Sequence, residues 1–231
     1  MRIQALNTIR RYFKRHITDD PDRFLKNVSG VIHIGANVGQ ERDLYAKYGL
    51  DVIWVEPIPE VFNQLVTNIA DYPKQKALRY LVTDHDDGEY TFHVSSNNGA
   101  SSSILDFKYH KDIWPTISYT NDITLHSVTL TKLISIEGID ISTYQALVMD
   151  TQGTELLILR GAEEIVTGFK YIKTEVPDFE AYEGCCMLDE LTGFLNQHGF
   201  REFSHKEFAE RKAGGCYYDV VYKRVEPNRC T

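Results

Sequence analysis

An α/β fold with a doubly wound, mostly parallel sheet is the fold class that this 231-residue sequence predicts. From residue 31 onward, short runs of β-branched residues alternate with amphipathic stretches of helical period. That alternation is typical of parallel strands joined by crossover helices. Since 42% of the residues are hydrophobic, the chain has enough apolar side chains for one sizeable core, and a single domain is expected.

The first predicted elements are two strands with a helix between them. Strands at 31–35 and 52–56 flank a stretch of helix-forming residues at 40–48. Gly49 follows this stretch and ends the helix. A second helix comes next, and its buried stripe consists of Val61, Leu65 and Ile69.

The middle of the chain predicts a hairpin and a long connection. A third strand at 78–83 and a returning strand at 90–94 flank the turn dipeptide Asp87-Gly88. Residues 95–126 are rich in Ser, Asn and aromatic side chains and show no sustained period. We therefore expect this stretch to cross the rim of the site and to contribute to substrate recognition.

The C-terminal half continues the alternation of strands and helices. Its predicted elements are a strand at 146–149 that ends in Asp150, a helix at 155–166, a strand at 171–176, a helix marked by Leu188, Leu191 and Leu195 and closed by Gly199, and two closing strands at 201–204 and 217–222.

The two ends of the chain lie outside the predicted domain. Residues 1–28 are expected to be a helical extension, residues 29–225 the domain and residues 226–231 a tail. The first 14 residues contain no apolar run long enough for a signal peptide or a membrane span. Ile3, Leu6, Ile9 and Phe13 have helical spacing with Arg or Lys between them, a pattern that also occurs in helices on anionic membrane surfaces. A helix packed on the domain is the favoured interpretation.

Charge and cysteine content narrow the partners and the compartment. Lys and Arg total 25 against 33 Asp and Glu, a formal charge of −8. A phosphate backbone would be repelled by most of this surface, so nucleic acid is not expected as a partner. The adjacent Cys185 and Cys186, with Cys216 and Cys230, lack zinc-site spacing and are interpreted as reduced thiols of a cytoplasmic protein.

The loop after the first strand has the composition of a ligand-binding loop. Gly35 and Gly39 are four residues apart, between an apolar strand and a helix. Free N–H groups and the positive end of the helix dipole can hold a carboxylate or phosphate there. The Gly-x-Gly-x-x-Gly spacing of a dinucleotide site is absent from this loop, which disfavours a nicotinamide-dependent reductase.

Glu56 ends the second strand, 21 residues after Gly35. An acid at this place can accept hydrogen bonds from both hydroxyls of a ribose. Pro57 disfavours helical backbone at Glu56 and keeps it extended. The alternative is a strand-end acid in contact with water.

Three segments together resemble the FkbM methyltransferase family. They are His33-Ile-Gly-Ala-Asn-Val-Gly39, Val55-Glu-Pro57 and Asp150-Thr-Gln-Gly-Thr-Glu-Leu-Leu-Ile-Leu-Arg-Gly161, and the resemblance extends over about residues 28–205, with Ser101-Ser-Ser-Ile104 and Thr174-Glu-Val176 in agreement. The resemblance implies a Rossmann-like class I methyltransferase fold with seven strands, including a closing antiparallel strand at the C-terminus. It also implies S-adenosylmethionine as methyl donor and a hydroxyl acceptor on a small molecule, sugar or glycan.

The resemblance also assigns residues to the donor site. Gly35, Ala36, Asn37 and Gly39 match the methionine end, Glu56 the ribose and Asp84 the adenine. The full set of expected donor-binding residues is His33, Gly35, Ala36, Asn37, Gly39, Glu41, Glu56, Pro57, Asp84 and Ser103. His33 departs from the family pattern, because an acid often stands there and a neutral imidazole has no negative charge. Glu41 is the candidate that compensates, and a strand histidine satisfied by the backbone is the alternative for His33.

Asp150 and Glu175 are the candidate catalytic residues. Transfer of a methyl group to oxygen needs donor and acceptor in line and a base for the acceptor proton. Asp150 and Glu175 end or nearly end two strands that are expected to be neighbours, and two nearby carboxylates raise each other's proton affinity. Helix capping by Asp150, orientation of the acceptor and binding of a divalent cation stay open as alternatives. His110 and His126 are the second choice of base.

Two further polar features and two alternative functions complete the sequence interpretation. Gln152 cannot ionise, so no charge is required of that side chain. The acidic run at 84–87 is interpreted as a turn, and no metal site is predicted. A catalytically impaired family member that acts as a binding or scaffold subunit is the main alternative, and a nicotinamide-dependent reductase the other. The sequence leaves the acceptor and the oligomeric state open.

Overall fold

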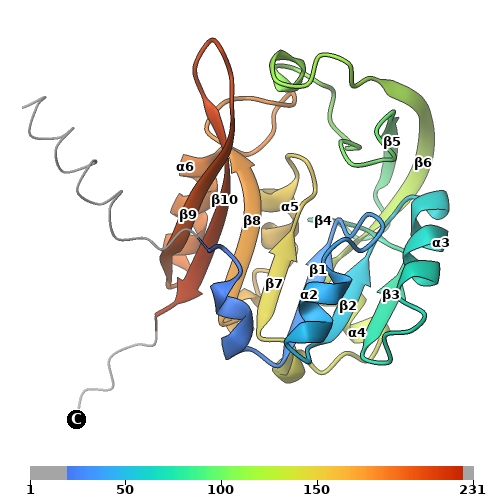
Figure 1. The fold of residues 1–231 in the computed structure, drawn as a ribbon, viewed down its shortest axis with the longest axis vertical. Coiled ribbons are helices and arrows are strands. Elements are labelled where there is room, and N and C mark those ends of the chain that lie inside the picture. The colour runs from blue at the N-terminus through green and yellow to red at the C-terminus, as the bar shows by residue number, and fades with distance from the viewer. Residues whose placement is uncertain (1–19, 226–231) are drawn as a thin grey trace, which may run out of the picture.

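The computed structural model describes residues 20–225. Its main element is a sheet of seven strands in the order β3-β2-β1-β7-β8-β10-β9 (Figure 1). The strands are β1 (Gly30–Ile34), β2 (Asp51–Val55), β3 (Gln75–Leu78), β7 (Ala146–Met149), β8 (Tyr171–Pro177), β9 (Phe200–Glu210) and β10 (Cys216–Arg224).

The sheet is mostly parallel, as predicted. In the order β3-β2-β1-β7-β8, each pair of neighbouring strands is parallel. Strand β10 is antiparallel to both of its neighbours, β8 and β9. The strand order reverses between β1 and β7, where the chain leaves one half of the sheet for the other. Open α/β sheets bind their ligands at the carboxyl ends of the strands at such a point. The prediction of a doubly wound sheet with a closing antiparallel strand is therefore confirmed.

Helices cover both faces of this sheet (Figure 1). Alternate residues of β1 show why, because Ile32 belongs to one hydrophobic core and Val31 to another. The Ile32 core includes residues of α4 (Leu130–Ile136), α5 (Glu155–Arg160) and α6 (Leu188–Gln197). The Val31 core includes residues of η1 (Arg23–Asn27), α2 (Arg42–Lys47) and α3 (Pro59–Asn68).

Short 3-10 helices connect several of these elements. Besides η1 they are η2 (His110–Asp112), η3 (Ile141–Thr143) and η4 (Val166–Gly168). Phe24 and Leu25 of η1 are buried in the core beside β1, so this part of the predicted extension packs on the domain. The amphipathic stretch predicted within residues 1–19, the tail at 226–231 and Cys230 lie outside the described residues.

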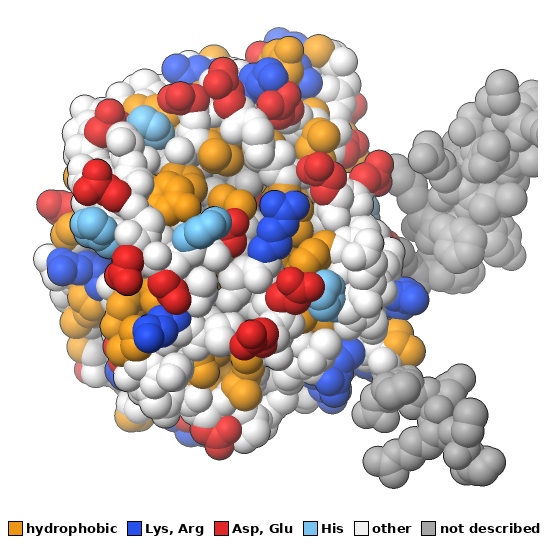
Figure 2. Space-filling model, turned by 180° about the vertical axis from the view of Figure 1, so that it is seen from behind, with side chains coloured by type: hydrophobic (Ala, Val, Ile, Leu, Met, Phe, Trp, Pro, Cys, Tyr) orange, Lys and Arg blue, Asp and Glu red, His pale blue; other side chains and the backbone are white. Residues whose placement is uncertain are grey.

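Charged side chains of both signs are spread over the face seen from behind the view of Figure 1, and the basic ones form no single patch there (Figure 2). This mixed face agrees with the formal charge of −8 for the whole chain. Among residues 20–225, no helix is both long and apolar enough to cross a membrane.

The predicted hairpin around Asp87-Gly88 is wrong. A second sheet contains β4 (Leu81–Thr83), β6 (Tyr119–Thr129) and β5 (Glu89–Ser95), with β6 in the middle. β4 pairs with β6 in parallel and β5 pairs with β6 antiparallel, so β4 and β5 never pair with each other. The turn itself bonds to β6, since the Asp87 amide donates to the carbonyl of Ser127.

Two further expectations are corrected. Strand β6 lies in the stretch predicted to be an irregular connection, and α4, which follows β6, was not predicted. Residues 120–122 near the start of β6 are all exposed, so no hydrophobic alternation marks them. Further along, Ile123 and Leu125 alternate with exposed residues and pack beside Phe92, a signal that the sequence interpretation missed. The helix predicted at 155–166 ends at Arg160 and a turn follows, because Gly161 lies directly against the end of β4.

A glycine-to-alanine pair tests this packing of α5 on β4. A Cβ at Gly161 would lie 2.3 Å from the carbonyl oxygen of Thr83, which is a backbone clash. A Cβ at Gly193, inside α6, would have no atom within 4 Å. We expect Gly161→Ala to lower the free energy of unfolding by about 2–4 kcal/mol and Gly193→Ala to raise it by about 0.5–1 kcal/mol in urea titrations. Equal effects of the two substitutions would contradict the close approach.

Candidate functional site

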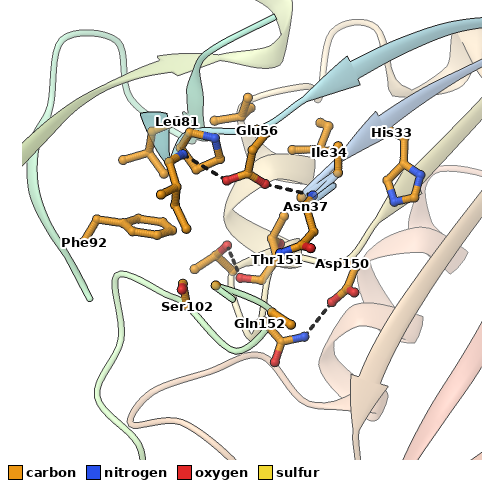
Figure 3. Close-up of a pocket in the computed structure, with 18 of the residues that line it drawn as sticks. His33, Ile34, Asn37, Glu56, Leu81, Phe92, Ser102, Asp150, Thr151 and Gln152 are labelled. Atoms are coloured by element: carbon orange, nitrogen blue, oxygen red, sulfur yellow. Dashed lines mark hydrogen bonds between the residues drawn. The ribbon is translucent and has the colours of Figure 1, made fainter. Parts of the chain in front are cut away.

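A cavity opens at the carboxyl ends of β1, β2 and β7, where the strand order reverses. The space between its walls is about 760 Å³, open solvent at its mouth included. Leu81 and Phe92 lie at one end, Glu56 lies near the middle, and Asp150 and Gln152 lie at the other end (Figure 3). The cavity is therefore elongated, with an apolar end and a polar end.

Gly35 occupies the point where β1 and β7 diverge. Its φ is +78°, and a Cβ there would lie 1.9 Å from the carbonyl oxygen of Asp150. The amides of Gly35 and Ala36 both donate to the carbonyl of Val55, at 3.0 and 3.1 Å. Only glycine combines this backbone conformation with so close a neighbour. The predicted turn at Gly35 is therefore fixed by its contacts with Val55 at the end of β2 and with Asp150 after β7.

The loop after Gly35 presents backbone N–H groups to the cavity region. Helix α2 begins at Arg42, and turns occupy most of the stretch before it. The amides of Val38, Gln40 and Glu41 have no hydrogen-bond partner among residues 20–225. Since α2 has only six residues, these loop amides are better candidates to hold an anion than the helix dipole that the sequence suggested.

Glu56 is the buried acid of the cavity, with 4% of its surface exposed. Its Oε2 accepts from the amide of Asn37 and its Oε1 accepts from the amide of Ile58, both at 2.9 Å. Burial raises the pKa of Glu56 to about 7, and the charge of Asp150 adds to the rise, while the two N–H groups oppose it. Glu56 is therefore a desolvated acceptor fixed between two loops, which excludes the alternative of a strand-end acid in water.

The apolar end of the cavity was missed by sequence reasoning. Ile58, Leu81 and Phe92 pack in one hydrophobic cluster and line the cavity. Tyr80 and Val82 also line the cavity. The signal was present in part, because Ile58 follows Pro57 directly after the acid. The contributions of β4 and β5 needed the second sheet, whose pairing the sequence predicted wrongly.

His33 lines the cavity and is buried. Its Nδ1 lies 3.1 Å from the Tyr45 hydroxyl, and its ring stacks on Trp54 with 5.0 Å between centroids. Burial lowers the pKa of His33 to about 4, against the opposing charge of Glu41. The imidazole is therefore neutral at pH 7, and its partner is a side chain rather than the backbone.

Asp150 and Glu175 follow paired residues of neighbouring parallel strands, Met149 of β7 and Thr174 of β8. Asp150 lines the cavity, and its Oδ1 accepts from Gln152 Nε2 at 2.5 Å. Burial raises the pKa of Asp150, and the charge of Asp150 together with burial raises that of Glu175. Glu175 lies outside the cavity lining, so of these two carboxyls only that of Asp150 belongs to the wall of the cavity.

A family model described as the methyltransferase FkbM domain matches residues 33–202. The chain belongs to the FkbM methyltransferase family. The chain is also 25% identical to the 2-O-methyltransferase NoeI of Sinorhizobium fredii (strain NBRC 101917 / NGR234) over 173 residues, 71% of this chain and 70% of NoeI.

One solved structure shares the fold of this family member, and another resembles it less closely. The METTL16 MTase domain is similar with a TM-score of 0.54 and 11% identity, and the match covers 89% of this chain but only 65% of the METTL16 chain. The 1,6-didemethyltoxoflavin-N1-methyltransferase of Burkholderia thailandensis has a TM-score of 0.44 and 10% identity, over 97% of this chain and 85% of the other. The METTL16 likeness shows the class I methyltransferase fold and nothing about the acceptor.

The cavity of this family member brings together most of the predicted donor-binding residues. Those that line it are His33, Gly35, Ala36, Asn37, Glu41, Glu56 and Pro57. Residues 99–104 also reach its rim through Gly99, Ala100, Ser102 and Ile104, as expected of the long connection.

Three predicted residues lie outside the lining. Gly39 has φ +73° and faces Leu65 of α3, where a Cβ would lie 2.8 Å from a methyl group. Asp84 Oδ1 lies 2.7 Å from Nδ1 of the exposed His85. The Ser103 hydroxyl donates to the carbonyl of Gln152 at 2.9 Å. Direct contact with the donor stays a prediction for these residues.

The remaining alternatives for the polar residues are a histidine base, a helix cap and a metal site. Neither candidate histidine lines the cavity. His110 is buried between the Tyr217 hydroxyl and Ser101 Oγ, and His126 is exposed on β6. Thr154 occupies the N-cap of α5, so Asp150 does not cap that helix. Within residues 20–225, no group of three His, Cys, Asp or Glu side chains has an arrangement that could hold a metal ion.

The raised pKa of Glu56 predicts a pH dependence of stability. Between pH 4.5 and 7 the folded protein keeps a proton on Glu56 that the unfolded chain has lost, so stability falls as pH rises through this range. We expect urea titrations at pH 5 and 8 to show a loss for the wild type that is smaller in Glu56→Gln, by as much as about 3 kcal/mol. Glu60→Gln, at an exposed carboxylate of α3, is the control and should retain the wild-type loss.

Proposed function

We propose that this chain is an S-adenosylmethionine-dependent methyltransferase that methylates a hydroxyl oxygen of a small molecule, sugar or glycan. The observation that carries the proposal is the buried carboxylate of Glu56, which lies between the apolar and polar ends of one cavity at the strand reversal. A nucleoside joined to an amino acid has the matching sequence of groups: an apolar base, a diol and a charged amino acid.

The residues of the cavity fit each part of this donor. Glu56 has acceptor capacity beyond its two N–H partners, which suits the ribose hydroxyls, with Pro57 keeping it extended. Ile58, Leu81 and Phe92 suit the adenine. Asp84 and Ser103 stay in the proposed donor site on the resemblance to the family alone, since neither lines the cavity. The loop from Gly35 to Glu41, with its unpartnered amides, suits the methionine carboxylate. When bound, S-adenosylmethionine supplies an electrophilic methyl group.

Asp150 is the proposed base. Its Oδ1 accepts from Gln152, which leaves Oδ2 for the proton of the acceptor hydroxyl. Burial raises its pKa toward the range where a carboxylate takes up a proton near neutral pH. Glu175 contributes a second negative charge from the neighbouring strand, which increases the proton affinity of the pair.

Three observations support the proposed acceptor and compartment. The similarity to NoeI, a 2-O-methyltransferase at 25% identity, favours oxygen as the methylated atom. The formal charge of −8 disfavours a nucleic acid. The free thiols of Cys185, Cys186 and Cys216 favour a reducing compartment, so we include a cytoplasmic location in the proposal.

Donor binding is the first test of the proposal. Calorimetry should show micromolar binding of S-adenosylmethionine and no binding of NADH, and the affinity should rise from pH 6 to 8 as Glu56 loses its proton. We expect Glu56→Ala to lower the affinity about 100-fold or more, because two hydrogen bonds to a charged group are lost. If the folded wild type binds neither ligand, a scaffold role is favoured. Binding of NADH alone would favour a reductase.

The role of Asp150 is tested by Asp150→Asn. The carboxamide keeps the size of the side chain but accepts no proton near pH 7. We expect unchanged donor affinity and a turnover at least about 100-fold lower, measured by mass spectrometry as the gain of one methyl group on a panel of sugars, glycans and other hydroxyl compounds. Wild-type turnover in this variant would remove Asp150 as the base.

A further inference from the structure

The backbone at Gln152 is held in an unusual conformation beside the cavity. Gln152 has φ +56°, one of four non-glycine residues with positive φ among residues 20–225, and Gly153 follows with φ +101°. A residue with a Cβ loses stability in the left-handed region, and such strain persists only where its surroundings fix it. The cause of the conformation therefore lies in the contacts of residues 151–153.

Two groups fix the backbone of this turn. The buried carboxylate of Glu155 accepts from the amides of Thr151, at 3.0 Å, and Gly153, at 3.1 and 3.2 Å. The hydroxyl of Ser103, from the segment that crosses the rim, donates to the carbonyl of Gln152 at 2.9 Å. With its backbone held in this way, Gln152 directs its side chain along the wall of the cavity towards Asp150 (Figure 3).

A chain of two hydrogen bonds then leads from Tyr182 to Asp150. The Tyr182 hydroxyl donates to Gln152 Oε1 at 2.7 Å, and Gln152 Nε2 donates to Asp150 Oδ1 at 2.5 Å. Tyr182 is 1% exposed and packs against Phe107 and His110, so its hydroxyl has a fixed position. Because this hydroxyl supplies a proton to the amide oxygen, the amide NH₂ group is turned towards Asp150.

A neutral amide suits this place electrostatically. Asp150 already shares the end of the sheet with Glu175, and both carboxyls are partly withdrawn from water. Glu155, Glu41 and Asp219 also raise the pKa of Asp150, and Lys173 opposes the rise at Glu175. A carboxylate at position 152 would add a further negative charge to this group. An amide instead donates an N–H, which favours the charged form of the Asp150 carboxyl and fixes one of its oxygens.

We propose that Gln152 and Tyr182 are positioning residues for the reaction, in which Tyr182 orients the Gln152 amide and the amide holds Oδ1 of Asp150 so that Oδ2 faces the acceptor. This inference rests on the proposed function, since it names the residues that orient its base. Neither residue needs to touch the donor or the acceptor for this role.

The test is a pH titration of Asp150, in which NMR monitors the labelled carboxyl carbons of the aspartates. The Asp150 signal is identified as the one missing from Asp150→Asn. In Gln152→Met, which has similar length and no amide, the apparent pKa of Asp150 should rise by about 1, because the ionised form loses its donor. In Tyr182→Phe the amide is free to turn, and a rise of about 0.5 is expected.

The matched control is Tyr222→Phe. Tyr222 is also buried, and its hydroxyl lies 2.6 Å from Thr192 Oγ1, away from the cavity lining. This substitution removes a buried hydroxyl at comparable cost to stability but should leave the titration of Asp150 unchanged. Thermal unfolding of all variants confirms that each is folded at the temperature of the titration.

The outcomes separate this inference from the proposed function. An Asp150 titration that is the same in wild type, Gln152→Met and Tyr182→Phe overturns the positioning role, whether or not S-adenosylmethionine binds. An equal rise in Tyr222→Phe also overturns it, since the effect would then be general loosening. Failure of the wild type to bind the donor overturns the proposed function and leaves the titration result readable on its own.

Discussion

The site depends on a carboxylate that is almost completely removed from water. Glu56 is satisfied by two backbone N–H groups, one from the loop after β1 and one from the residues after β2. Burying an acid in this way is costly unless donors are supplied, and the rise in its pKa records the remaining cost. The same two bonds join the loop that carries Asn37 to the segment that carries Ile58, so the carboxylate organises both walls of the cavity.

A second constraint is the close approach of Gly35 to Asp150, directly after the paired strands β1 and β7. The carbonyl of Asp150 lies where a side chain at Gly35 would be, and this contact sets Asp150 beside the loop that faces the cavity. The strained turn at Gln152 follows immediately and is held by Glu155 and Ser103. The candidate donor site and the candidate base are therefore parts of one continuous stretch of backbone contacts. A displacement of the backbone at Gly35 would move both the loop and Asp150.

The parts of the fold that depend on local pattern were predicted well. Strand β1, the helix stripe of Val61 and Leu65, and the end of α6 just before Gly199 follow from hydrophobic period and glycine conformation, which act within a few residues. The second sheet was not predicted, because β4 and β5 each pair with β6, which begins more than 20 residues after β5 ends. Alternation along a strand shows which face is buried but does not identify the strand's partner.

By itself the sequence determined the doubly wound sheet, the glycine loop at Gly35, the acid at Glu56 and the resemblance to the family that the chain belongs to, because each of these is written in neighbouring residues at fixed spacing. The tertiary structure alone decided which side chains share the cavity. It brought Leu81 and Phe92 to the apolar end, kept Gly39, Asp84 and Ser103 out of the lining, and joined Tyr182 to Asp150 through Gln152. Such contacts arise between segments far apart in the chain, and their geometry depends on how the strands cross, which no local pattern encodes.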